Sequence, residues 1–577
     1  MFKKEYGFYI DETYSNNITV EHIPFTEGIN AYKLNLHFNE PTVVKNIKIC
    51  YFKPMRGLLS VWHSSAPRNR ALRQWFDKNA VKSNFYLGAP LISVIDGENN
   101  YCTIALSDAQ TPCELNAFVD DFSDNDEICF DIILFSGVEK LVSDYSIFVR
   151  IDDQNKPYYK SISDVKNWWN YFYPAVIDNC ESAEDALYSS WYNFHQHPNE
   201  QTLKEELLIA SKMGFKTFIL DDGWQYDGNG TADYFDCGDW EFSKEKFPNP
   251  REFIDYVHSL GMKILVWFPV PFVGYNTQKY KEFSDKLLCN NDFFRAGILD
   301  PRYKEVREFL VDTYRGFVQK YDLDGLKLDF IDSFKLLPTS PSYDAKKMDF
   351  DDVEKAVDCL LKDVIQMLKE CKDKPLFEFR QNYVGPAITK YCNMLRVADC
   401  AFDSVTNKIA VVDLRLLNYD LAVHSDMLYW SKYESPTNVK KQLINVIFSV
   451  PQISVLLANS SKEHLEVIKN HIEYFNDNKT LLLHGEIQPV GNDLLYPCVS
   501  SSLGDKTVSV ISCPYAIEYN GKKHDIFNNS DVEWVSVVST VNCFCKVVDI
   551  YGKVIKNFEV VKGANLIKVP VGGMIAF

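Results

Sequence analysis

The sequence predicts a (β/α)8 barrel that lies between two β domains. Three observations support this: short alternating strands fill roughly the first 150 residues, apolar strands alternate with helical stretches from about residue 184, and strand-like alternation returns after about residue 480. A chain of 577 residues is also too long for one compact core. We therefore expect a multidomain β plus α/β fold: an N-terminal β-supersandwich over 1–165 with a linker to about 183, a (β/α)8 TIM barrel over 184–475, and a C-terminal antiparallel β domain over 476–577.

The N-terminal part is predicted to be a sandwich of short antiparallel strands. Apolar and polar residues alternate in Ile18–Ile23, Tyr32–Phe38 and Val43–Ile49, and Ser146–Arg150 closes the set. Turn residues separate the later runs, as in a sandwich with regular strand spacing. The stretch that follows, Asp152 to Ala183, is too rich in aromatic residues for a flexible coil, so we expect it to wrap onto the next domain.

Apolar runs and helical stretches alternate through the central region, as repeated βα units do. Helices are expected between most of the strands, at Asn199–Met213, from Asn249-Pro250 onward, at Tyr303–Tyr321 and at Asp351–Cys371. Only about a dozen residues join strands five and six, which predicts a stunted helix there. The eight predicted barrel strands are Leu187–Tyr192, Thr217–Asp222, Lys263–Pro269, Gly325–Asp329, Leu376–Arg380, Met394–Asp399, Ala422–Leu428 and Gln452–Leu457.

The last hundred or so residues alternate again and are predicted to form a smaller antiparallel β domain. Thr507–Ile511, Glu533–Val538 and Asn565–Val569 are its clearest strands. Turn signals occur at Asn520-Gly521-Lys522 and at Tyr551-Gly552-Lys553.

Charge and cysteine content exclude several classes of partner. The formal net charge of −18 repels nucleic acid and anionic membranes, so neither is expected as a partner. No apolar run is long enough for a transmembrane helix, and the N-terminus lacks the apolar segment of a signal peptide. The 15 cysteines show no metal-binding spacing, so we expect free thiols, no metal and a cytoplasmic location. Nothing in the residues decides between a monomer and a homo-oligomer.

Charged and aromatic side chains follow the predicted barrel strands at their carboxyl ends, where TIM barrels build their sites. Carboxylates and cations grip sugar hydroxyls by charge-assisted hydrogen bonds, and tryptophan packs on the ring, so this set predicts a sugar-binding pocket. His424 is expected to be a core histidine, and metal binding by Asp221, Asp222 and Asp426 is disfavoured because no ligand loop is present. In strand order the residues are Trp191; Asp221 and Asp222; Trp267; Lys327 and Asp329; Glu378 and Arg380; Arg396 and Asp399; His424 and Asp426.

Two of these carboxyl groups are predicted to do chemistry, because cleavage of a glycosidic bond needs a pair of them. Lys327 and Asp329 point to the same face of their strand, so the ammonium should keep Asp329 ionised as the nucleophile. Asp399 is expected to be the acid/base, with a pKa raised by burial or by neighbouring carboxylates. Asp403 competes for that role. No cofactor is needed for such a reaction.

These motifs resemble those of glycoside hydrolase family 36, the retaining α-galactosidases or melibiases, through the whole barrel from Trp191 to about Leu457. Lys327-Leu328-Asp329 is similar to the family's nucleophile motif, and Val266–Pro269 to its strand-three aromatic segment. The resemblance implies that Asp221 and Asp222 hold the C4 and C6 hydroxyls of galactose. It also implies that Asp399 is the acid/base, that Arg396 reaches the C2 hydroxyl, and that the flanking domains are β domains.

The segment after strand five departs from the family pattern. Many members carry a Cys-Ser-Gly-Gly type segment close to the sugar, whereas Phe377–Asn382 is bulky and charged here and contains Glu378, Arg380 and Gln381. The resemblance implies a retaining exo-α-galactosidase acting on small oligosaccharides such as melibiose or raffinose. An α-N-acetylgalactosaminidase, another α-glycosidase or a transglycosylase remains an alternative on the same scaffold. A non-catalytic carbohydrate-binding protein is the alternative from another class.

Overall fold

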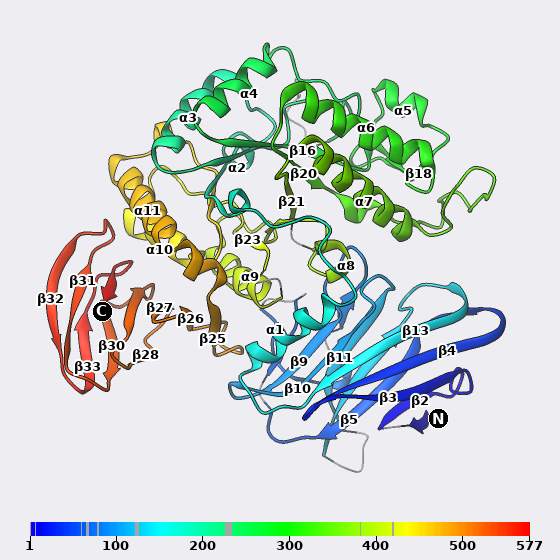
Figure 1. Ribbon diagram of the computed structural model, residues 1–577, viewed down its shortest axis with the longest axis horizontal. Coiled ribbons are helices and arrows are strands. Elements are labelled where there is room, and N and C mark those ends of the chain that lie inside the picture. The colour runs from blue at the N-terminus through cyan, green and yellow to red at the C-terminus, as the bar shows by residue number, and fades with distance from the viewer. Residues whose placement is uncertain are drawn as a thin grey trace.

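The chain forms a central barrel with a β domain at each side, the N-terminal one blue and the C-terminal one red in Figure 1. This computed structural model describes residues 2–5, 7–58, 60–64, 68–77, 80–121, 126–225, 233–380, 382–417 and 420–577. The predicted fold class is confirmed. No helix in these ranges is long and apolar enough to cross a bilayer.

The N-terminal domain is a sandwich of two sheets, ordered β1-β2-β5-β12-β11-β7 (with β8 on β11) and β3-β4-β13-β10-β9-β6. Neighbouring strands are antiparallel except β7 on β11. The predicted strand Val43–Ile49 is wrong, because the chain crosses there from one sheet to the other and Asn46 takes a positive φ of 51°. The elements are β1 (Phe2–Glu5), β2 (Phe8–Asp11), β3 (Ile18–Thr26), β4 (Ile29–Val44), β5 (Ile47–Pro54), β6 (Ser60–Trp62), β7 (Arg73–Gln74), η1 (Trp75–Asp77), β8 (Val81–Ser83), β9 (Leu91–Asp96), β10 (Asn99–Leu106), β11 (Cys113–Asp120), β12 (Glu127–Leu134) and β13 (Lys140–Asp152).

The stretch after β13 contains a buried helix, α1 (Tyr158–Trp169), followed by the short η2 (Glu181–Glu184). Trp169 Nε1 donates to the Leu106 carbonyl in the sandwich at 2.8 Å. The Tyr158 hydroxyl donates to the Pro489 carbonyl in the C-terminal domain at 3.0 Å. The aromatic residues therefore tie the stretch to the sandwich and to the C-terminal domain, and Ser163 Oγ donates to the Leu416 carbonyl of the barrel at 3.5 Å.

Eight parallel strands form the barrel, in the order β23-β22-β21-β20-β16-β15-β14-β24. Parallel bridges from His424 to Val450 and from Leu428 to Ile453 bring the two ends of this sheet together. All eight predicted strands are present, and five of them end earlier than predicted because the residues beyond leave the strand in loops or short helices. The strands are β14 (Leu187–Ser189), β15 (Thr217–Leu220), β16 (Lys263–Pro269), β20 (Gly325–Asp329), β21 (Leu376–Arg380), β22 (Met394–Arg396), β23 (Ala422–His424) and β24 (Gln452–Ile453).

Helices cover the outside of the barrel, and side-chain caps begin several of them. Asn199 accepts from the Thr202 amide at the start of α3, and Asp352 accepts from the Lys355 amide at the start of α7. The short α8 between strands five and six confirms the predicted stunted helix. The barrel's helices are α2 (Trp191–Phe194), α3 (Glu200–Lys212), α4 (Pro250–Ser259), α5 (Gln278–Glu282), α6 (Lys304–Tyr321), η3 (Ile331–Ser333), α7 (Val353–Cys371), α8 (Pro386–Thr389), α9 (Ser404–Leu417), α10 (Pro436–Asn445), η4 (Leu457–Asn459) and α11 (Lys462–His484).

A small sheet of β17 (Phe272–Gly274), β19 (Ala296–Leu299) and β18 (Leu287–Asn291) follows the third barrel strand. These strands of three to five residues are too short to show a period, so the sequence pattern does not predict them. Tyr234, Phe272 and Phe294 pack here against Phe330, which directly follows the fourth barrel strand.

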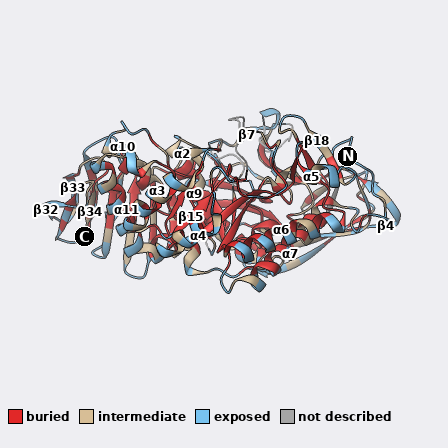
Figure 2. Cartoon of the chain, turned by 90° about the horizontal axis from the view of Figure 1, so that it is seen from above, coloured by how far each residue is buried: buried red, intermediate tan, exposed pale blue. Residues whose placement is uncertain are grey.

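The C-terminal domain has a seven-stranded sheet, β25-β26-β27-β29-β34-β31-β32, and a three-stranded one, β28-β30-β33. It is mainly antiparallel as predicted, but β27–β29 and β28–β30 are parallel pairs. Figure 2 shows that buried residues fill the interiors of the barrel and of both flanking domains. The strands are β25 (Glu486–Val490), β26 (Cys498–Leu503), β27 (Lys506–Ile511), β28 (Ala516–Tyr519), β29 (Lys523–Asn528), β30 (Trp534–Ser539), β31 (Cys543–Val548), β32 (Val554–Val560), β33 (Gly563–Lys568) and β34 (Met574–Ala576).

A buried ion pair joins all three domains behind the barrel mouth. Arg70 of the sandwich lies 2.5 Å from Asp413 of α9, and both side chains are almost fully buried. The Tyr496 hydroxyl from the C-terminal domain donates to Asp413 at 2.7 Å, and Trp62 Nε1 donates to it at 2.9 Å. These contacts fix α9, whose preceding loop carries two of the aspartates considered for the acid/base role.

Candidate active site

Asp329 lies at the end of the fourth barrel strand and is held by donors from three directions. Trp267 Nε1 donates to Oδ2 at 2.9 Å, Arg380 Nε donates to Oδ1, and the Phe330 amide donates to Oδ1 at 2.6 Å. Phe330 adopts a positive φ of 59°, a costly conformation for a bulky residue that turns the chain sharply after the strand. Asp329 is therefore fixed in position, with 6% of its surface exposed.

The cation that contacts Asp329 is Arg380, whereas Lys327 was expected there. Lys327 Nζ instead lies 2.6 Å from Asp221 Oδ2 and 4.0 Å from Glu378 Oε1. Both side chains of the strand point into the barrel as predicted, but the long lysine reaches across it to the second strand. Arg380 of strand five occupies the position beside the predicted nucleophile. The strand pattern alone did not indicate which cation would lie there.

Asp221 and Asp222 form the closed end of the pocket, 3% and 1% exposed. Asp222 accepts from Gln196 Nε2 at 2.8 Å and from Gln225 Nε2 at 3.0 Å. Burial raises the pKa of Asp222 to about 7, although the two amides partly oppose it. Gly223 is required after the pair, because at φ +102° an added Cβ would lie 2.5 Å from the Gln196 backbone.

Asp399 stands at the mouth of the pocket between two arginines. Its Oδ1 accepts from Arg396 Nη2 at 2.7 Å and its Oδ2 from Arg380 Nη1 at 3.1 Å. Burial raises the pKa of Asp399, but the two guanidinium groups outweigh this effect and lower it to about 2. The expected raised pKa is therefore wrong for this arrangement, because the nearest groups are cations and not carboxylates. The side chain is 46% exposed, so solvent and substrate can reach it.

Arg380 bridges the two predicted catalytic carboxyls, since it contacts Asp329 through Nε and Asp399 through Nη1. The gap between these carboxyls is thus spanned by one guanidinium group and two hydrogen bonds. Gln381, which follows Arg380, lies outside the described residues.

A second layer of buried groups holds Arg396. Its Nη1 donates to Asp426, which also accepts from the Tyr192 hydroxyl at 3.0 Å and the Cys400 amide at 2.7 Å. Burial raises the pKa of Asp426, and Arg396 opposes that effect. Glu378 Oε1 lies 4.0 Å from Arg396 Nε and has no hydrogen-bond partner among the described residues. Burial also raises the pKa of Glu378.

His424 is a structural residue, as expected. Its Nε2 faces the Ala183 carbonyl at 2.8 Å and its Nδ1 faces Gln452 Nε2 at 3.1 Å, so the proton is assigned to Nε2. Gln452 Nε2 also donates to Glu378 at 2.7 Å. Burial lowers the pKa of His424 to about 4, which keeps the ring neutral.

Two predicted site residues lie apart from this network. The ring of Trp191 packs edge-on against His195, 5.3 Å between centroids, and contacts no other predicted site residue in the described ranges through a hydrogen bond or ring contact. Asp403 accepts from the Thr406 amide at 3.0 Å, as a helix N-cap does, and pairs with Arg68 at 2.5 Å. The geometry therefore favours Asp399 over Asp403.

Sequence reasoning missed four polar side chains of the site. Gln452 starts the predicted eighth strand and Tyr192 ends the predicted first, so a buried polar group in a strand was a usable signal for both. Gln196 and Gln225 lie in loops, and only the folded chain brings their amides to Asp222.

A cavity of about 350 Å³ opens at the same end of the barrel, and its lining, among the described residues, includes none of the predicted site residues. Its lining comes from the loops after strands one, six, seven and eight. Phe402, 70% exposed, lies 5.0 Å from Tyr429 between ring centroids, and Tyr433 is 84% exposed. Phe402 is three residues beyond Asp399, so one lining side chain comes from the loop that carries this carboxyl.

Fold and site together define a three-domain (β/α)8-barrel protein with a cluster of carboxylates and cations at the carboxyl ends of its strands. Residues 159–379 match the family model for melibiase, which includes Asp329 and ends before Asp399. Over these residues the chain is similar to the melibiase family, as the resemblance to glycoside hydrolase family 36 predicted.

Known relatives agree with this assignment over part of their length. The chain is 32% identical to α-galactosidase Mel36A of Lactobacillus acidophilus over 154 residues, which are 25% of this chain and 20% of that protein. It is 28% identical over 143 residues to the A type blood α-D-galactosamine galactosaminidase of Flavonifractor plautii, 23% of this chain and 12% of that one. The matched segments thus span a fifth or less of these curated relatives.

Solved structures share the fold over nearly the whole chain. A variant of the family 36 α-galactosidase AgaA from Geobacillus stearothermophilus, in complex with 1-deoxygalactonojirimycin, superposes with a TM-score of 0.68 at 12% identity. The match covers 99% of this chain and 82% of that one. Another AgaA variant, in complex with raffinose, gives 0.68 over 97% and 81%.

Proposed function

We propose that this protein is a retaining exo-α-galactosidase that removes terminal α-galactosyl units from small oligosaccharides. The observation that carries the proposal is the pair Asp329 and Asp399, which face each other across a single guanidinium group. Glycosidases place two carboxyls on opposite sides of the bond they cleave. The names of the relatives, all α-galactosidases or a galactosaminidase among those cited, support a galactose-type sugar.

The reaction follows from the positions of the two carboxyls. One oxygen of Asp329 attacks the anomeric carbon while the bond to the leaving oxygen breaks and that oxygen takes a proton from Asp399. Water then attacks the same carbon, gives its proton to Asp399 and releases Asp329. Two displacements at one carbon retain its configuration.

Asp221, Asp222 and Lys327 are proposed to hold the sugar from its far side. The two carboxylates are almost fully buried, so they form a closed end against which only a terminal ring fits. Lys327 contacts Asp221 at 2.6 Å, and charge-assisted hydrogen bonds from such a pair would fix the hydroxyls of the ring. This closed end supports removal of terminal units.

The leaving sugar is proposed to lie in the aromatic cavity at the same end of the barrel. Phe402 and Tyr433 offer exposed ring faces there, and the volume of about 350 Å³ is within the range of small-molecule sites. One of its lining residues, Phe402, lies in the loop that carries Asp399, the carboxyl that must protonate the leaving oxygen. Melibiose and raffinose, which continue beyond galactose by one and two sugars, suit this arrangement.

Arg380 must move when a sugar binds, because the ring has to occupy the space between Asp329 and Asp399. Separation from Arg380 would remove one of the two cations that hold the pKa of Asp399 low, and would leave its carboxyl able to take up a proton. Arg380 would then lie beside the ring and contact a substituent of the sugar. A change of role on binding reconciles the low pKa with an acid/base function.

Hydrolysis of a panel of 4-nitrophenyl α-glycosides tests the proposal: galactoside, N-acetylgalactosaminide, glucoside and fucoside. We expect the galactoside to be preferred, Asp329→Asn to abolish its hydrolysis, and sugar binding by that variant to persist. Asp403→Asn is the matched control, since asparagine caps a helix as well as aspartate does, and it should keep its activity. Parent-like hydrolysis by Asp329→Asn would show that another residue is the nucleophile.

Strand five supports one other candidate, an α-glycosidase with a different sugar specificity. Arg380 and Glu378 stand where many family members carry a small segment, and Arg380 occupies the pocket itself. Preference for the N-acetylgalactosaminide or another glycoside would keep the two-carboxyl mechanism and assign specificity to this strand. Sugar binding without turnover of any substrate would favour the non-catalytic protein.

A further inference from the structure

Four buried polar side chains meet in the N-terminal sandwich, in a different domain from the barrel pocket. They are Cys50 of β5, Cys129 and Asp131 of β12, and Asn116 of β11. Each is at most 3% exposed. Because side chains alternate along a strand, they lie on the sheet face opposite to that of the sandwich core, to which the neighbouring Ile132 belongs.

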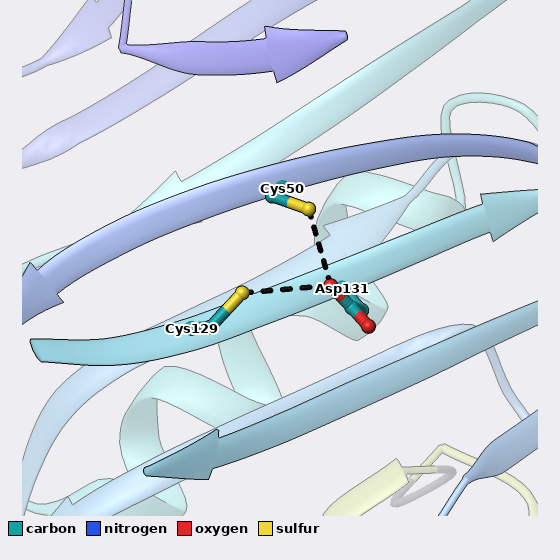
Figure 3. A group of neighbouring side chains, drawn as sticks. All are labelled: Cys50, Cys129 and Asp131. Atoms are coloured by element: carbon teal, nitrogen blue, oxygen red, sulfur yellow. Dashed lines mark hydrogen bonds between the residues drawn. The ribbon is translucent and has the colours of Figure 1, made fainter. Parts of the chain in front are cut away.

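Both thiols point at one carboxylate oxygen, as Figure 3 shows. Cys50 Sγ lies 3.2 Å and Cys129 Sγ 3.4 Å from Asp131 Oδ1. The three atoms lie within 4.8 Å of one another. A tetrahedral zinc ion with sulfur ligands at about 2.3 Å has ligand-to-ligand edges of roughly 3.5–3.8 Å, so small side-chain movements would close these atoms around one ion.

Asn116 supplies an independent sign of a missing partner. It stands directly opposite Asp131 on one neighbouring strand, as Cys50 does on the other. Its side chain is 1% exposed, and neither its Oδ1 nor its Nδ2 has a hydrogen-bond partner among the described residues. A buried amide left unpaired costs about 1–3 kcal/mol, so the site as it stands lacks a ligand for this group.

We propose that Cys50, Cys129, Asp131 Oδ1 and Asn116 Oδ1 bind one zinc(II) ion. Two thiolates with oxygen donors in a closed, buried site are ligands that zinc accepts in structural positions. The ion would join β5, β12 and β11 across the sheet. Sequence spacing gives no metal motif here, because the ligands come from three strands.

The charges balance with and without the ion. Lys48 Nζ lies 3.3 Å from Asp131 Oδ2, so one carboxylate oxygen faces a cation and the other faces the thiols. On binding, Zn²⁺ replaces the two thiol protons, which leave to solvent. The site, including Lys48, then carries two thiolates, one carboxylate, one ammonium and a divalent ion, and it remains neutral as before. A neutral buried site avoids the penalty of an unpaired buried charge.

Metal binding by the full-length protein tests the proposal, with Co²⁺ as the spectroscopic probe and Zn²⁺ as competitor. We expect one Co²⁺ per chain with thiolate-to-cobalt charge-transfer absorption, displaced by Zn²⁺. Cys50→Ser and Cys129→Ser should each remove at least half of that absorption. Cys113→Ser, which changes a buried cysteine of the sandwich core, is the matched control and should leave it unchanged.

Two further measurements keep the test decisive if a cysteine variant fails to fold. Zinc X-ray absorption of the unaltered protein should show two sulfur neighbours at about 2.3 Å. Asn116→Leu should weaken metal binding about tenfold or more while raising the melting temperature of the metal-free protein, because it removes an unpaired amide. Only nitrogen and oxygen neighbours around zinc, or no stoichiometric metal binding, would overturn the proposal. Neither readout depends on the barrel's activity.

Discussion

Arg380 offers the sharpest test of how the barrel site works, because it contacts both predicted catalytic carboxyls. Arg380→Met keeps an unbranched apolar stem and removes the guanidinium group with its charge. Asp399 then retains Arg396 at 2.7 Å and loses the second cation. We expect the pKa of Asp399 to rise in the free enzyme.

The structure sets the size of this rise. Asp399 has a pKa of about 2 against an ordinary value near 3.9, a net lowering of about two units. An arginine beside an aspartate lowers its pKa by about 1–3 units, so loss of Arg380 should raise the pKa of Asp399 by about one unit or more. One unit changes the protonated fraction of Asp399 about tenfold at any pH well above its pKa.

The assay is the pH dependence of kcat/KM for melibiose, which reports the ionisation of the free enzyme. Melibiose has a poor leaving group and needs the acid, whereas 4-nitrophenyl α-galactoside needs it much less. In the pH profile of Arg380→Met, the descending limb, where kcat/KM for melibiose falls as pH rises, should lie about one pH unit higher than in the parent. Arg380→Lys keeps a charge and should move it less.

The reasoning is refuted if the descending limb of Arg380→Met stays at the pH of the parent's limb while Asp399→Asn removes the limb altogether. The two results together would mean that Asp399 is the acid but that Arg380 does not set its pKa. If Asp399→Asn keeps the limb, the acid is another residue, and Asp403→Asn becomes the next variant to measure.

Three other changes have expected outcomes. Asp222→Asn should abolish sugar binding and flatten the pH dependence of stability. The folded pKa of Asp222, about 7, exceeds the unfolded value near 3.9, so the parent protein loses stability as pH rises from about 4 to 7. Melting temperatures across that range would show whether the variant keeps its stability. Gly223→Ala should lower the melting temperature and the soluble yield, because its Cβ would meet the Gln196 backbone at 2.5 Å; a parent-like melting curve would contradict this. Asp413→Ala should destabilise the protein by about 3–5 kcal/mol in urea unfolding, because it removes the carboxylate that faces the buried Arg70 guanidinium, whereas loss of an exposed pair costs under about 1 kcal/mol.

Much of the barrel was predictable because its signals are local. A run such as Gly325–Asp329 shows by its own apolar residues that it is a buried strand, and its acidic end shows which side chain reaches the mouth. All eight strands were found this way. Short strands such as β17 and β18 escaped because a few residues carry no period. The crossing at Asn46 escaped because a change of sheet leaves the alternation of the chain almost intact.

The sequence by itself determined which acids stand at the barrel mouth, since strand ends and side-chain alternation follow from neighbouring residues. Only the tertiary structure decided which charge meets which. Lys327 pairs with Asp221 and Arg380 with Asp329, while Asp403 meets Arg68, 335 residues away. Cys50 meets Asp131 across 81 residues in the same way. Such pairings depend on where distant strands and loops come to lie, and a buried charge or thiol is fixed by the partner that the packing brings to it.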